Sequence, residues 1–174
     1  MAWSKLRSTS GPLIIALLCQ GFLKYSFLGT SLSTAVKTFS IQDFQPSVAL
    51  GPADLAQQLT EKLSSELLHK TSLRQVATDG DIQFEGTVTG FKRAFIAPRN
   101  DEQAGTAGRI QLTITLQVSY SNAHDQEFAF SEKTFVQSAD MDSTANAVAE
   151  EPKLVAEIVS RLIKDILDAS VANW

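Results

Sequence analysis

A strictly alternating segment between Arg109 and Ser121 constrains the fold of this chain more than any other feature. Every second residue of the segment is apolar, and polar residues lie between them. A period of two is the spacing of side chains on one face of a β-strand, and it is too regular for a helix. The apolar face of this strand must therefore be covered by other apolar side chains. Its residues are Ile110, Leu112, Ile114, Leu116, Val118 and Tyr120.

Two segments with helical periodicity can supply that cover. Leucines recur every four residues between Asp54 and Lys70, and two apolar stripes run side by side between Pro152 and Leu167. Each stripe predicts an amphipathic helix that must pack against another element. Gly51-Pro52 fits the start of the first helix, because proline in a first turn loses only a donor that would be unpaired there. We expect the second helix to begin at Pro152. The stripe residues are Leu55, Leu59, Leu63 and Leu67, and then Leu154, Val155, Ile158, Val159, Leu162, Ile163, Ile166 and Leu167.

Four further segments predict strands, namely residues 36–44, 73–78, 81–95 and 127–138. Asp79-Gly80 predicts a hairpin turn into the third of them, and residues 141–150 are expected to be a polar connection. The order favours an α+β two-layer sandwich, with two amphipathic helices packed on one face of a mostly antiparallel four- to five-stranded sheet. A small barrel is the alternative, and it would leave both apolar stripes without a partner.

The front end of the chain has the layout of a bacterial export signal. Lys5 and Arg7 precede a seven-residue apolar run from Leu13 to Cys19, which is too short to span a bilayer. We therefore predict an export signal or lipoprotein-like leader over residues 1–21 and a tether over 22–34, rich in Ser, Gly and Thr. The remaining residues, 35–174, suit a single domain with its own core.

Cys19 is the only cysteine, so the predicted domain can hold neither a disulfide framework nor a cysteine-ligated zinc. Two interpretations of Cys19 stay open. It is either the acylated first residue of a mature lipoprotein, and so the lipid attachment site, or an ordinary apolar residue of the leader.

The residues of the predicted domain do not form a recognisable catalytic or metal-binding set. A net charge of −4 without a basic stripe gives no reason to expect a nucleic acid partner. His69 and His124 lack the spacing of a metal site and are interpreted as a helix-terminal cation and a solvated turn residue. Asp79-Gly80-Asp81 lacks the ligand spacing of a calcium loop. We therefore predict no catalytic residue, no metal and no cofactor, and a protein that is not an enzyme.

Basic and aromatic residues give the candidate contact positions. Lys92, Arg93 and Arg99 gather at the end of the third predicted strand, and Arg109 follows across the loop. They could bind the phosphates of a lipid head group, or they could be solubilising charges that protect a strand end. Trp174, at the end of the chain, could dock in a groove or remain exposed.

Short motifs in a fixed order resemble the LptE-like lipopolysaccharide-assembly lipoproteins, of the Bacteroidetes type. They extend over nearly the whole chain after the leader, which makes the series specific although each motif is short. The motifs are Tyr25-Ser26-Phe27-x-Gly29-Thr30-Ser31, Lys37-Thr38-Phe39-Ser40-Ile41-x-x-Phe44, Leu55-x-Gln57-x-Leu59-Thr60-Glu61-x-Leu63, Thr71-x-Leu73, Asp79-Gly80-Asp81-Ile82-Gln83-Phe84-Glu85-Gly86, Arg109-Ile110-x-Leu112-Thr113-Ile114 and Ser170-Val171-Ala172-Asn173-Trp174.

The resemblance implies a non-enzymatic component of the outer membrane, on its periplasmic face. It further implies a partner, an LptD-like β-barrel translocon that the chain partly plugs, and transport of lipopolysaccharide to the outer leaflet. Two features depart from the family pattern. Phe22 stands where relatives carry the lipid-bearing cysteine, with Cys19 three residues earlier, and Pro152 interrupts the usual start of the last helix.

The alternative function is a freestanding periplasmic module that binds lipid or another envelope component without a barrel. The departure at Phe22 and the basic residues from Lys92 to Arg99 favour this alternative. Recovery of a β-barrel protein with the chain from native membranes would discriminate between the two.

Overall fold

The computed structural model describes residues 35–46, 51–96, 108–143 and 146–171, so the predicted leader and tether lie outside the described residues. The described part contains two helices and one six-stranded sheet. The elements are β1 (Thr38–Ile41), β2 (Gln45–Pro46), α1 (Leu55–Lys70), β3 (Arg74–Gln75), β4 (Ile82–Ile96), β5 (Arg109–Asn122), β6 (Phe130–Asp142) and α2 (Ala147–Ser170).

Three long strands form the main part of the sheet. β4, β5 and β6 follow one another as an antiparallel meander, while the short strands β1 and β2 pair in parallel along the free side of β4. β3 pairs in parallel with β1, which gives the order β3-β1-β4-β5-β6. The sheet is therefore mixed and has six strands. Four or five mostly antiparallel strands were predicted, and the additional two-residue strand β2 and the parallel pairs account for the difference.

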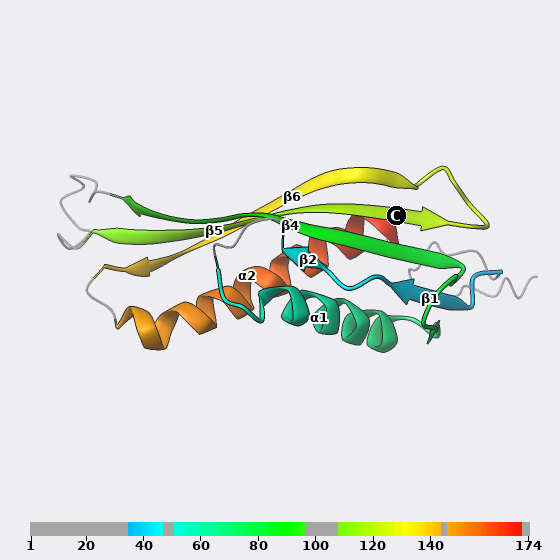
Figure 1. Cartoon of the computed structure of the whole chain (residues 1–174), viewed down its shortest axis with the longest axis horizontal. Coiled ribbons are helices and arrows are strands. Elements are labelled where there is room, and N and C mark those ends of the chain that lie inside the picture. The colour runs from blue at the N-terminus through cyan, green and yellow to red at the C-terminus, as the bar shows by residue number, and fades with distance from the viewer. Residues whose placement is uncertain (1–34, 47–50, 97–107, 144–145, 172–174) are drawn as a thin grey trace, which may run out of the picture.

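Both helices lie on the same side of this sheet, as Figure 1 shows. All four leucines of the α1 stripe are buried, and so are all eight residues of the doubled α2 stripe. They meet the alternating apolar face of β5, where every residue from Leu112 to Tyr120 in the period-two series is buried. The predicted α+β class with two helices on one sheet face is confirmed, and the apolar series of β5 belongs to the core.

The hairpin predicted at Asp79-Gly80 was wrong. β3 does not pair with β4, because β1 lies between them with Thr38 opposite Arg74 and Phe39 opposite Ile82. Gly80 makes this arrangement possible, since a Cβ atom on it would lie 2.5 Å from the backbone nitrogen of Ser40. Only a residue without a side chain lets the chain pass so close to β1.

The boundaries predicted around the last helix were also wrong. β6 continues to Asp142, and α2 begins at Ala147, so Pro152 lies inside the helix rather than at its start. A proline in the second turn removes one helical hydrogen bond, the one to the carbonyl of Val148. The extended apolar stripe from Leu154 onward, which is buried, offsets that loss.

Gly86 shapes the contact between β4 and α1. A Cβ atom at this position would overlap the ring of Phe44, which is buried against the glycine. The backbone nitrogen of Phe44 in turn donates a hydrogen bond of 3.1 Å to Thr60 Oγ1 on α1. Gly86 therefore makes room for the aromatic side chain that joins the parallel edge of the sheet to the first helix.

Replacement of Gly86 tests this packing. We expect Gly86→Ala to lower the free energy of unfolding by about 1–3 kcal/mol, because the methyl group must displace a buried ring. Urea denaturation followed by circular dichroism measures the change. Gly90→Ala is the matched control on the same strand, since its new Cβ atom would lie 3.2 Å from Thr115 and the loss should be smaller. A Gly86→Ala penalty that persists unchanged in a Phe44→Leu background would contradict this account.

Candidate functional site

The sheet face that points away from the helices is uncharged along β5 from Gln111 onward, while Glu85 and Lys92 of β4 and Asp140 of β6 carry charges on either side of it. On β5 this face alternates with the buried apolar one, and none of its residues after Arg109 is charged or apolar. A typical protein surface has charged residues at about a quarter to a third of its positions. We call this surface the open face. Its β5 residues are Gln111, Thr113, Thr115, Gln117, Ser119 and Ser121.

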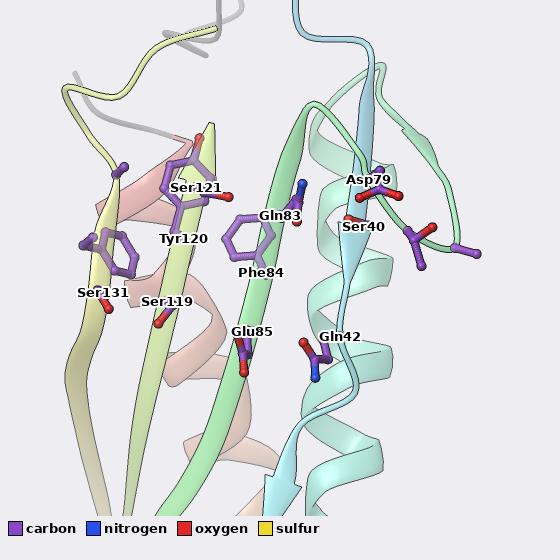
Figure 2. Close-up of a pocket in the computed structure, with 14 residues that line it drawn as sticks. Ser40, Gln42, Asp79, Gln83, Phe84, Glu85, Ser119, Tyr120, Ser121 and Ser131 are labelled. Atoms are coloured by element: carbon purple, nitrogen blue, oxygen red, sulfur yellow. The ribbon is translucent and has the colours of Figure 1, made fainter. Parts of the chain in front are cut away.

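The open face is hollowed at the end where β1 and the start of β4 lie beside the end of β5. The groove there has a volume of about 810 Å³ and is bounded by the loop 77–79 on one side and residues 129–131 on the other. Figure 2 shows its polar side chains spread across four neighbouring segments, with both helices behind the sheet. Its neutral polar residues are Ser40, Gln42, Thr78, Gln83, Ser119, Tyr120, Ser121 and Ser131.

Two carboxylates complete the polar lining of this groove. Asp79 lies in the loop before β4, with a backbone φ of 55°, and Glu85 lies on β4 itself. The lining contains neither lysine nor arginine. Phe130 also borders the groove, but its ring packs toward the core, with its centre 5.6 Å from the ring centre of Tyr120 and 6.0 Å from that of Phe135. The groove therefore offers hydroxyl, amide and carboxylate groups, and its net charge is negative.

Asp81 fixes the wall of the groove by binding the start of β1. Its Oδ2 atom accepts hydrogen bonds of 2.9 Å each from the backbone nitrogens of Lys37 and Thr38 and from Thr38 Oγ1. Its Oδ1 atom lies 3.1 Å from Nε2 of His124, in the turn after β5. One carboxylate thus joins three segments, and Gly80 beside it donates a hydrogen bond to Ser40 Oγ.

These contacts lower the pKa of Asp81 far below its ordinary value of 3.8. The largest cause is the hydrogen bond from the Lys37 backbone, followed by those from Thr38 and His124. A depressed pKa means that the ionised carboxylate stabilises the folded state. That contribution is complete above the ordinary pKa and is lost as the pH falls below it.

A neutral replacement of Asp81 should therefore remove both stability and its acid dependence. We expect Asp81→Asn to lower the melting temperature at pH 7 and to flatten the loss of stability below about pH 4, the ordinary range for this carboxyl. Thermal unfolding measured from pH 7 to pH 2 tests this. Asp79→Asn, two residues away in the same loop, is the control and should keep the acid dependence of the natural chain. Equal profiles for both variants would contradict the assigned role.

The structure does not bring the predicted basic residues together in one patch. Arg93 is opposite Leu112 and therefore lies on the helix side, where its guanidinium pairs with Glu151 of α2 through two hydrogen bonds and lies 5.2 Å from the Phe91 ring centre. Lys92 is opposite Thr113 and lies on the open face. Arg109 begins β5, opposite Ile96 and Asp142.

Arg93 therefore has a structural contact that Lys92 lacks within the described residues. We expect Arg93→Ala to lower the free energy of unfolding by about 0.2–1 kcal/mol, the usual worth of a partly exposed ion pair. Lys92→Ala should leave it unchanged, and chemical denaturation of both variants makes the comparison. A larger loss for Lys92→Ala would show that its side chain has a structural role instead.

Three of the predicted site residues have no described position in the structure. Cys19, Arg99 and Trp174 lie outside the described residues, as does most of the loop before Arg109. The interpretation of His124 as a solvated turn residue was incomplete, because its ring contacts Asp81 from 43 positions away. Within the described part of the chain, no group of three His, Cys, Asp or Glu side chains could hold a metal ion.

The groove and the open face were missed by the reasoning from sequence. A signal for the open face was present, since polar positions that alternate with a buried series usually include lysine or glutamate. In β5 they are limited to glutamine, threonine and serine from residue 111 onward. The groove left no comparable signal, because its walls come from segments far apart in the chain.

Comparison with known families identifies the chain. The family model for LptE, described as lipopolysaccharide-assembly, matches residues 36–170, which is most of the chain and nearly all of its described part. The chain belongs to the LptE family. The resemblance carried by the short motifs is thereby confirmed. The search of curated proteins gives no match.

Several solved structures are similar to this chain. A hypothetical protein of Chlamydia trachomatis is 9% identical, with 76% of this chain and 94% of that chain covered and a TM-score of 0.50. Lipoprotein B of Nitrosomonas europaea is 12% identical, with 76% and 80% covered and a TM-score of 0.48. Rare lipoprotein B of Shewanella oneidensis is 14% identical, with 75% and 92% covered and a TM-score of 0.45. At these identities the likeness concerns the fold alone.

Proposed function

We propose that this LptE family member is a non-enzymatic component of the outer membrane, on its periplasmic face, that partners and partly plugs an LptD-like β-barrel translocon. Its role there is to help lipopolysaccharide reach the outer leaflet. Membership of a lipopolysaccharide-assembly family supports the pathway. The open face is the observation that best supports a large partner, because it is a broad sheet surface without a helix over it.

The chemistry of the open face suits the inner wall of such a barrel. The interior of a large transmembrane barrel is polar and offers hydrogen-bonding side chains. Hydroxyl and amide groups such as those of Thr115 and Gln117 can exchange water for these partners at little cost. A charged side chain would lose far more hydration free energy on the same contact. A neutral polar surface is therefore suited to being covered by another polar surface.

The first 34 residues have the roles of export and attachment in this proposal. Residues 1–21 act as the export signal, Cys19 is the candidate lipid attachment site, and 22–34 form the tether to the domain over 35–174. None of the helices in the described residues has an apolar stretch sufficient to cross a membrane. A lipid on the leader or the barrel itself would hold the domain at the membrane.

The predicted contact residues keep a place in this proposal. Lys92 lies on the open face, where its charge could meet a lipopolysaccharide phosphate. Arg93 is a weaker candidate, because Glu151 already neutralises it. Arg99 and Trp174 remain candidates on the sequence alone.

Purification from native membranes tests the partnership. A tagged full chain, extracted in mild detergent, should recover a β-barrel protein of the lipopolysaccharide pathway. Gln117→Glu places a charge in the middle of the open face with almost no change of shape. We expect it to reduce recovery of the barrel about tenfold, since the carboxylate must lose its hydration on contact.

Ser160→Glu is the matched control, because it adds the same charge at an exposed position of α2, on the helix side. It should leave recovery unchanged. Isolation of the natural chain as a monomer only would contradict the partnership and favour the freestanding module. Equal recovery with both variants would exclude the open face as the contact surface.

A further inference from the structure

We infer that the groove on the open face binds a neutral oligosaccharide. The inference deepens the proposed function, since it assigns the sugar part of a transported glycolipid, rather than its phosphates, to a site on this chain. It rests on the residues that line the groove, on their charge and on the way the surrounding chain holds them.

The kinds of group in the groove match the groups of a sugar. Ser119, Ser121 and Ser131 have hydroxyls that both donate and accept, and Gln83 has an amide that does the same. A sugar presents many hydroxyl groups, each able to donate and accept. Figure 2 shows these side chains distributed over the width of the groove, so that several could contact one extended ligand.

The charge of the groove selects against anions. Glu85 and Asp79 are the charged residues of its lining, and both are carboxylates. They would repel a phosphate or carboxylate ligand, whereas a carboxylate can accept hydrogen bonds from two sugar hydroxyls at once. The basic residue Lys92 lies on the same face, but it is not among the residues that line the groove. The two regions of the open face therefore suit different parts of one glycolipid.

The size and construction of the groove also fit a ligand larger than an ion. Its volume of about 810 Å³ is within the range of small-molecule sites, about 300–1,000 Å³. The wall at Ser40 is fixed by the Gly80 hydrogen bond and the Asp81 contacts. A wall held by these contacts loses little conformational freedom on binding.

Titration of the isotope-labelled full chain, followed by NMR of its backbone amides, tests the inference. The probe is the polysaccharide released by mild acid from the lipopolysaccharide of the source bacterium, in the uncharged fraction that an anion-exchange column does not retain. We expect shifts at Gln83, Glu85, Ser119 and Ser121, and no shifts there with inorganic phosphate. No shifts with the polysaccharide, or shifts confined to residues 111–117, would overturn the site. Equal shifts with phosphate would overturn the assigned ligand class.

Paired variants give the quantitative test. Glu85→Ala should weaken polysaccharide binding about tenfold, because a charged acceptor is lost. Thr87→Ala, the next open-face position on β4, is the control and should change binding less than about twofold, since Thr87 does not line the groove. Comparable weakening by both variants would contradict the inference. A well-dispersed amide spectrum of each variant verifies that it is folded.

Polysaccharide binding can be measured independently of the translocon partnership, because the titration contains no barrel protein. Gln117→Glu, which lies outside the groove, should keep its polysaccharide affinity while its recovery of the barrel falls about tenfold. If the natural chain recovers the barrel but does not bind the polysaccharide, the sugar site is refuted and the translocon partnership is not.

Discussion

The fold depends on one packing constraint, which is that two helices cover only one face of the sheet. The doubled stripe of α2 and the leucine stripe of α1 are buried against the apolar residues of β4 and β5. Each buried side chain of this kind contributes about 1.5–3 kcal/mol relative to exposure. The apolar side chains are thereby buried on one side of the sheet. The residues of the opposite face do not pack in the core, so core packing does not restrict which residues stand there.

The dimensions of the elements explain what lies outside that core. At their usual rises α1 is about 24 Å long, α2 about 36 Å, and β4 about 50 Å. β4 is therefore longer than either helix, and its end projects beyond α1 in Figure 1, on the side where α2 begins. Phe95, which would otherwise belong on the helix side, is 68% exposed there. The end of the β4–β5 pair is thus available for contacts that the helices do not supply.

Periodicity predicted the long elements, and contacts between distant residues decided the rest. The leucine stripe of α1 and the alternation of β5 are local signals, so both could be predicted from the sequence. The position of β1 depends on Gly80 and Asp81, which lie 40 and 43 positions after the β1 residues that they contact. The prediction that Lys92 and Arg93 lie together was wrong for a related reason. The alternation of β4 shifts at the bulge between Val88 and Gly90. That shift places Lys92 on the open face and Arg93 beside α2.

The outer edge of β6 shows why a partner would use the open face rather than add a strand. A 13-residue edge strand is ordinarily a template for pairing with another chain. Here Arg161 of α2 donates to the backbone carbonyl of Ser138, which occupies an acceptor on that edge. Glu132 has a φ of 50°, and this conformation breaks the extended backbone that a new strand would require. With the edge interrupted and one face covered, the open face, which is uncharged along β5 from Gln111 onward, is the extended surface that the described chain leaves for a partner.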